Sequence, residues 1–214
     1  MIVIGKKSII NNLKLKIMKI KKTILITLIY ILSFSSSYSL EADVFVQSTI
    51  NRASEVLSKN LTKDQKIDEL KKIAKDTVDI KRIGLYTLGP ARKSLSEDQK
   101  KKYSVLFEQY FLTSFSNRLV VYTNPDIDVY NKEVLNEKFV IVNSLLKGTD
   151  ERPEVKIDWR IFTKDPKKPL ILDLIIEGLS LARTQKEEFS SILNSNEGDI
   201  NALFTTLENY SKNN

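Results

Sequence analysis

The chain has 214 residues, of which 34 are Lys or Arg and 27 are Asp or Glu, giving a formal net charge of +7 at neutral pH. It contains no cysteine and no histidine. These absences exclude disulfides, thiol–imidazole pairs and His-dependent catalytic triads, and they remove the usual ligands of zinc sites.

The N-terminal segment has the features of an export signal. Basic residues at positions 19–22 precede an apolar run over residues 23–34, and Ser37 and Ser39 fit the small-residue positions of a signal-peptidase site. The apolar run is shorter than the roughly 20 residues that span a membrane. We therefore expect export and cleavage after Ser39, with an uncleaved membrane anchor as the alternative.

This predicted leader also accounts for the excess positive charge. Residues 1–39, an N-terminal extension plus the signal peptide, hold seven lysines and no acid, so residues 40–214 retain 27 basic and 27 acidic side chains. The remaining 175 residues suffice for a single domain with a sizeable core. A balanced charge does not favour a nucleic-acid binder.

Helical patterns fill the first half of this domain. Apolar spacing predicts a helix over residues 43–57. Thr62 and Gln65 form a capping-box pattern that opens a second helix over residues 62–74. A short apolar segment, residues 80–88, then ends at a Gly-Pro pair, which breaks regular structure.

The clearest helix begins at another capping box, formed by Ser96 and Gln99. Large apolar side chains then recur at i, i+3 and i+4 spacing, and the pattern continues to Tyr122 before an Asn-Pro pair. This aromatic stripe contains Tyr103, Leu106, Phe107, Tyr110, Phe111, Phe115 and Leu119.

Strands follow this helix. Residues 139–146 are apolar on both faces, which suits an interior strand. Two further strands alternate apolar with polar residues; their apolar positions are Val155, Ile157, Trp159 and Ile161, then Leu170, Leu172, Leu174 and Ile176. A capping pattern at residues 184–187 and a last run at 199–210 predict two closing helices. The class is α+β, an antiparallel sheet of about four strands packed against a helical layer.

Two carboxylates, Asp173 and Glu177, are the candidates for acid–base chemistry. They are four residues apart on one strand, so they lie roughly 13 Å from each other. This separation is larger than the distance between the two catalytic carboxyl groups in retaining or inverting glycosidases. Ser180 follows them, but it lacks a nucleophile elbow and a base. We interpret both acids as structural, with Arg160 or Arg183 as partners.

The helix stripe and the alternating sheet face supply more large apolar side chains than the closure of a small domain requires. Composition leaves two possibilities open for these surfaces. They interlock as an ordinary core, or they enclose a cavity.

The C-terminal part, residues 173–210, resembles the signature of the MlaC family of periplasmic phospholipid-binding proteins, also called toluene tolerance proteins. That signature has an acid, then Glu-Gly-[Val/Leu]-Ser-[Leu/Met], then an acidic or amide residue beside an aromatic one. The matching residues here are Asp173, Glu177, Gly178, Ser180, Glu188 and Phe189. The helix with Tyr103, Phe107 and Tyr110 and the strand with Trp159-Arg160 resemble earlier blocks, so the similarity covers nearly all of residues 40–210. Where many members have Tyr-Arg, this chain has Gln185-Lys186.

The resemblance implies a deep apolar pocket between sheet and helices that takes phospholipid tails and leaves the head group near solvent. It implies neither a cofactor nor a catalytic or metal site. The residues expected to line this pocket are Tyr103, Phe107, Tyr110, Phe111, Val155, Ile157, Trp159, Ile161, Leu172, Leu174 and Ile176.

The same resemblance implies a location and partners. We expect a soluble, monomeric periplasmic carrier that shuttles phospholipid between the outer and inner membranes and so maintains outer-membrane lipid asymmetry. Its expected partners are an inner-membrane Mla-type ABC transporter with its substrate-binding-domain hexamer and an outer-membrane lipoprotein–porin complex. The alternative is a periplasmic binding protein or small enzyme for another hydrophobic ligand, such as a hopanoid-like lipid.

Overall fold

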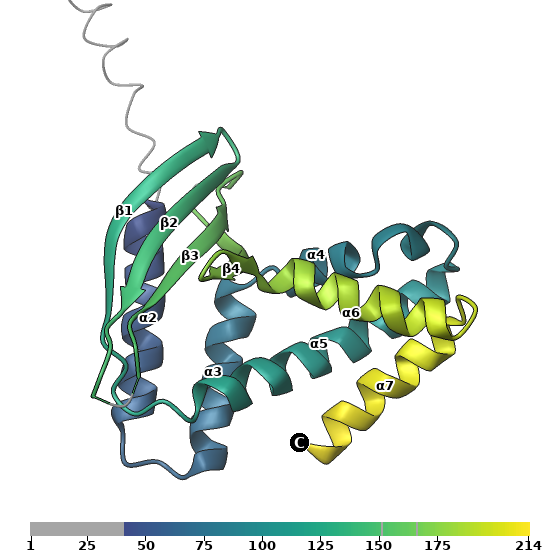
Figure 1. Ribbon diagram of the computed structural model, residues 1–214, viewed down its shortest axis with the longest axis horizontal. Coiled ribbons are helices and arrows are strands. Elements are labelled where there is room, and N and C mark those ends of the chain that lie inside the picture. Colours follow the sequence, from purple (N-terminus) through teal and green to yellow (C-terminus); the bar gives the residue numbers. More distant parts are fainter. Residues whose placement is uncertain (1–40, 151, 166) are drawn as a thin grey trace, which may run out of the picture. The chain divides into compact units, whose positions relative to one another are not determined.

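The computed structural model describes residues 41–150, 152–165 and 167–214 (Figure 1). The predicted signal peptide and its cleavage point after Ser39 lie outside the described residues. Within the described part of the chain, no helix is long and apolar enough to cross a membrane. The fold below is that of the unit Leu40–Asn214.

Three helices open the domain: α2 (Ala42–Ser58), α3 (Lys63–Thr77) and α4 (Ile80–Thr87). Thr62 caps α3, because its hydroxyl accepts the Gln65 backbone N–H while the Gln65 side chain accepts the Thr62 backbone N–H. These two bonds satisfy donors that a helix N-terminus otherwise leaves unpaired. The capping box predicted from the sequence is confirmed.

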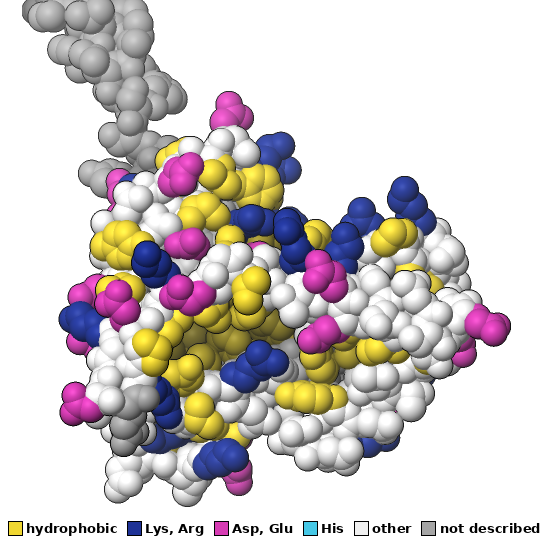
Figure 2. Space-filling view, in the orientation of Figure 1, with side chains coloured by type: hydrophobic (Ala, Val, Ile, Leu, Met, Phe, Trp, Pro, Cys, Tyr) yellow, Lys and Arg dark blue, Asp and Glu magenta, His cyan; other side chains and the backbone are white. Residues whose placement is uncertain are grey.

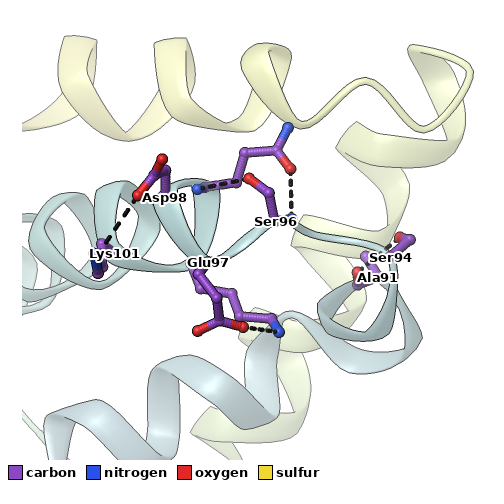
Figure 3. Close-up of polar contacts among 8 residues, drawn as sticks. Ala91, Ser94, Ser96, Glu97, Asp98 and Lys101 are labelled. Atoms are coloured by element: carbon purple, nitrogen blue, oxygen red, sulfur yellow. Dashed lines mark hydrogen bonds and ion pairs between the residues drawn. The ribbon is translucent and has the colours of Figure 1, made fainter.

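The long helix α5 (Glu97–Leu119) follows a short 3-10 helix, η1 (Gly89–Lys93). Figure 3 shows its N-terminus, where Ser96 and Gln99 form the second predicted capping box. Glu97 and Asp98 add negative charge to the first turn, which stabilises the positive end of the helix dipole. The start of α5 is therefore fixed by local sequence alone.

The sheet has five antiparallel strands in chain order: β1 (Ile127–Asn136), β2 (Phe139–Leu146), β3 (Val155–Phe162), β4 (Leu170–Ile176) and β5 (Leu179–Ser180). Each strand pairs with its sequence neighbour, so the connections are hairpins. The α+β class is confirmed, and β2 is an interior strand as predicted. The pattern of the first strand, β1, was missed.

The helix after the sheet begins earlier than the sequence predicted. α6 spans Leu181–Ser195, and its N-cap is Ser180, whose hydroxyl accepts the backbone N–H of Arg183. The capping pattern that starts at Thr184 lies within the helix, so it was the wrong start. Ser180 ends the two-residue strand β5 and opens α6 at once, which leaves no loop between them.

The helices meet the sheet at different strands: α2 packs on β1 and β2, while α4 and α6 pack on β4 (Figure 1). The last helix, α7 (Ile200–Asn213), packs on α5 and α6. Here Phe107, Phe189 and Leu203 are almost wholly buried, and the rings of Phe107 and Phe189 meet edge to face at 6.3 Å. These residues form a fully buried part of the core where α5, α6 and α7 meet.

Gly84 allows α4 to approach α5 closely. A Cβ atom at this buried position would lie 2.7 Å from Cδ1 of Phe107, well inside van der Waals contact, and the Phe107 ring is only 2% exposed. We expect Gly84→Ala to lower the free energy of unfolding by about 1–3 kcal/mol, the usual cost of overpacking. Denaturant unfolding measures this change. The double variant with Phe107→Leu should recover part of the loss, and a fully stable Gly84→Ala protein would contradict the close packing.

Candidate functional site

A large apolar cavity lies between the sheet and helices α2, α3, α5 and α6. Its volume is about 310 Å³, at the lower end of the range of ligand pockets in proteins, about 300–1,000 Å³. Figure 2 shows it as a hollow lined by hydrophobic side chains between the sheet and the helices. The two surfaces that the sequence left undecided therefore enclose space over part of their area.

Most of the residues predicted to line a pocket surround this cavity. Nine of the eleven do so: Phe107, Tyr110, Phe111, Val155, Ile157, Trp159, Leu172, Leu174 and Ile176. Tyr103 and Ile161 do not. Tyr103 lies on α5 and Ile161 on β3, and each of these elements extends from the cavity into the closely packed core.

Tyr103 lies at the core end of the aromatic stripe. It is 1% exposed, and its hydroxyl is 2.8 Å from the Thr87 hydroxyl. Burial raises the pKa of Tyr103 above its ordinary value, so the phenol stays protonated and serves as a satisfied core group. Ile161, next to the last residue of β3, is 0% exposed and also belongs to the core.

The predicted alternation of β4 is interrupted. A bulge places Ile171 opposite Ile161, while Asp173 stays opposite Arg160, so Leu172 has no partner on β3. The four apolar positions of β4 therefore do not form one continuous face. The bulge makes Ile171 part of the buried core instead.

Helices α2 and α3 form a wall that the sequence did not assign to the site. Their contribution is a set of apolar side chains at helical spacing: Ile50, Ala53, Leu57, Leu70 and Ile73. The stripe on α2 was visible in the sequence. Nothing in that stripe distinguishes a cavity wall from ordinary core, because both need the same apolar face.

The cavity walls hold apolar surface that is only partly covered by other protein groups. Phe111 and Phe115 stack at 5.7 Å between ring centroids, and both are half-buried, as are Ile157 and Leu174. When a ligand covers apolar surface that was in contact with water, the free energy falls by about 25 cal/mol for each Å² covered. The cavity thus favours a ligand that is itself largely apolar.

Among the described residues that line the cavity, Asp173 is the one buried acid. Its carboxylate accepts a hydrogen bond from the Ser180 hydroxyl at 2.6 Å and another from the Ala182 backbone N–H at 3.0 Å. The acid therefore holds the N-terminus of α6 on β4, where the helix dipole also favours negative charge. The partners expected from the sequence, Arg160 and Arg183, are wrong.

Glu177 has a different task from Asp173. It lies at φ 48° with Gly178 at φ 82° in the tight turn between β4 and β5, and its carboxylate accepts the Lys156 backbone N–H. Two successive residues with positive φ form the hairpin turn in which glycine is favoured. Glu177 is therefore tied to the turn and does not face Asp173 across a reaction centre.

The rim of the cavity is polar. Arg118 on α5 and Glu188 on α6 are both exposed and both border the opening, together with Tyr110 and Gln185. The Tyr110 hydroxyl donates to the Gln185 side-chain oxygen at 2.7 Å, which connects α5 with α6. Among the described residues, no group of three acids that could hold a metal ion is present.

Comparison with known proteins identifies the family. The sequence pattern of the MlaC protein family matches residues 47–209. The chain belongs to the MlaC family. No curated protein matches the chain.

The fold is also that of a solved structure, the phospholipid-binding protein from Ralstonia solanacearum in complex with a phospholipid. The two share 16% sequence identity with a TM-score of 0.67, over 80% of this chain and 97% of the other. The resemblance to MlaC proteins expected from the sequence is confirmed, and the family match spans residues 47–209.

Proposed function

We propose that this MlaC-family protein carries phospholipid, with the acyl chains in the cavity between the sheet and α5 and the head group at the polar rim. The observation that carries the proposal is the cavity itself, whose walls are mostly apolar. Apart from the hydrogen-bonded Asp173, its charged lining residues are the exposed Arg118 and Glu188. The related Ralstonia protein, which has the same fold, was solved with a phospholipid bound.

The energetics suit such a carrier. Two acyl chains hold roughly 30 methylene groups, and exposing each to water costs about 0.8 kcal/mol, so the whole lipid meets a barrier above about 20 kcal/mol. Each methylene that enters the cavity removes its share of that barrier. A protein that covers the tails therefore makes passage through water fast enough to be useful.

Membership of the MlaC family supports a proposal for the location and partners of this carrier. In our proposal the exported chain works in the periplasm as the substrate-binding component of an Mla-type ABC transport system. It exchanges lipid with the substrate-binding-domain hexamer of the inner-membrane transporter and with a lipoprotein–porin complex of the outer membrane.

The proposal includes no chemistry on the lipid. The Ser180 hydroxyl accepts the Arg183 N–H and donates to Asp173, so it is committed to the helix cap. A sequence without histidine or cysteine also offers no imidazole base and no thiol nucleophile for acyl transfer. These features support a carrier rather than a hydrolase.

Native mass spectrometry tests the proposal on protein purified from the periplasm without added lipid. We expect one diacyl phospholipid per chain, which organic extraction and tandem mass spectrometry identify. A sterol-like or hopanoid-like mass in its place would contradict phospholipid carriage, as would protein that stays empty after incubation with phospholipid vesicles.

A further inference from the structure

Arg118 stands out on the rim because its charge is uncompensated. Its side chain borders the apolar cavity, yet it makes no hydrogen bond or ion pair with any described residue. It is also the only basic residue on the described part of the cavity wall. A guanidinium is well suited to bind a phosphate group, since its planar donors match phosphate oxygens.

Glu188 borders the same opening from α6. The Gln185 side-chain amide donates to its carboxylate at 2.8 Å, and Gln185 in turn accepts the Tyr110 hydroxyl. This chain of two hydrogen bonds holds the carboxylate in place without neutralising it. Glu188 has no ion-pair partner among the described residues, so it is available to a cation of the ligand.

The charges of Arg118 and Glu188 both affect the ionisation of Tyr110 at the rim. Burial raises the pKa of the Tyr110 hydroxyl, the negative charge of Glu188 raises it further, and the positive charge of Arg118 lowers it. Both groups thus influence the ionisation of Tyr110: Arg118 lies two turns further along the same helix, α5, and Glu188 lies on α6. The rim presents one cation and one anion that are not paired with each other.

We propose that this pair reads the head group, and that it selects a zwitterionic phospholipid bearing a primary amine, with Arg118 binding the phosphate and Glu188 binding the ammonium. The inference rests on the proposed function and adds the class of lipid. An anionic glycerol head group would satisfy Arg118 but bring no cation to Glu188. An uncharged diacylglycerol would satisfy neither group.

A competition between lipids tests this inference. The purified protein is incubated with vesicles of equal parts phosphatidylethanolamine, phosphatidylglycerol and diacylglycerol of the same acyl composition, and mass spectrometry quantifies the bound lipid. We expect the ethanolamine lipid to be enriched about two- to fivefold over the glycerol lipid, the scale of exposed charge pairs. Glu188→Gln should remove that enrichment, and Arg118→Gln should lower both phospholipids relative to diacylglycerol.

Matched controls come from α6, the helix that carries Glu188. Glu187→Gln and Arg183→Gln change neighbouring exposed residues that line a separate polar groove, and both should bind lipids as the wild type does. Bound lipid in vesicle proportions, unchanged by Glu188→Gln and Arg118→Gln, would overturn the inference and leave phospholipid carriage standing. A preference for the glycerol lipid would also overturn it. Wild-type protein that takes up no phospholipid would instead overturn the proposed function.

Discussion

Replacing Ile157 by aspartate is expected to lower lipid occupancy at least tenfold while the domain remains folded. Ile157 lies on β3 and is half-buried on the cavity wall. In the empty cavity the new carboxylate keeps contact with water. A bound acyl chain would remove that water and leave an unpaired charge, which costs several kcal/mol. Each 1.4 kcal/mol is a factor of ten in affinity. Native mass spectrometry measures occupancy and thermal melting measures folding.

Ile161 is the matched control, because it lies on the same strand four residues further along and is fully buried in the core. Ile161→Ala should lower the free energy of unfolding by about 2–4 kcal/mol. Ile157→Ala should cost about 1 kcal/mol or less, because its side chain already faces open space. Equal losses in the two alanine variants would show that Ile157 is ordinary core, and full lipid occupancy in folded Ile157→Asp would show that this face does not meet the lipid.

Removing the carboxylate of Asp173 should cost about 2–4 kcal/mol of stability. Asp173→Ala leaves the buried Ala182 N–H and the Ser180 hydroxyl without their acceptor. Hydrogen bonds to a charged group contribute about 1.5–3 kcal/mol each, and a buried donor without a partner retains its desolvation cost. Chemical denaturation measures the loss. Asp173→Asn should fall between the wild type and alanine, since its amide oxygen can still accept one of the two bonds.

The control for this variant is Asp199→Ala, which removes the exposed cap of α7 and should cost only about 1 kcal/mol. Neither variant should alter an enzymatic rate, because we propose that the protein has none. Phospholipid hydrolysis that disappears in Asp173→Ala while its melting temperature stays at the wild-type value would contradict both the structural interpretation of the acid and the carrier proposal.

The elements that local patterns specify were predictable from the sequence. The two capping boxes at Thr62 and Ser96 fix helix starts through bonds between residues three apart, and neither depends on the rest of the fold. β3 alternates strictly and was found. β1 was missed because it is mostly exposed and because irregular pairing after Val129 and after Val134 breaks its period of two.

The candidate site was only partly predictable for a related reason. An apolar stripe shows which face turns inward, but not where along its length the opposing wall stops touching it. Tyr103 and Phe111 belong to the same stripe on α5, yet one lies in the core and the other lines the cavity. Arg118 had no recognisable pattern in the sequence, and Glu188 was marked only by its place in the MlaC-like signature. That both residues line one cavity follows from the tertiary structure alone.

The cavity draws its walls from the beginning, the middle and the end of the domain: Ile50 on α2, Phe111 on α5 and Leu181 on α6 all border it. No hairpin or helix pair encloses the space alone, so an incomplete or partly unfolded chain has no cavity in which an acyl chain can bind. A ligand that binds only the native state shifts the folding equilibrium toward that state. In a lipid carrier built this way, the bound lipid stabilises the native fold. The empty protein that remains after lipid release is therefore the form most susceptible to unfolding and proteolysis.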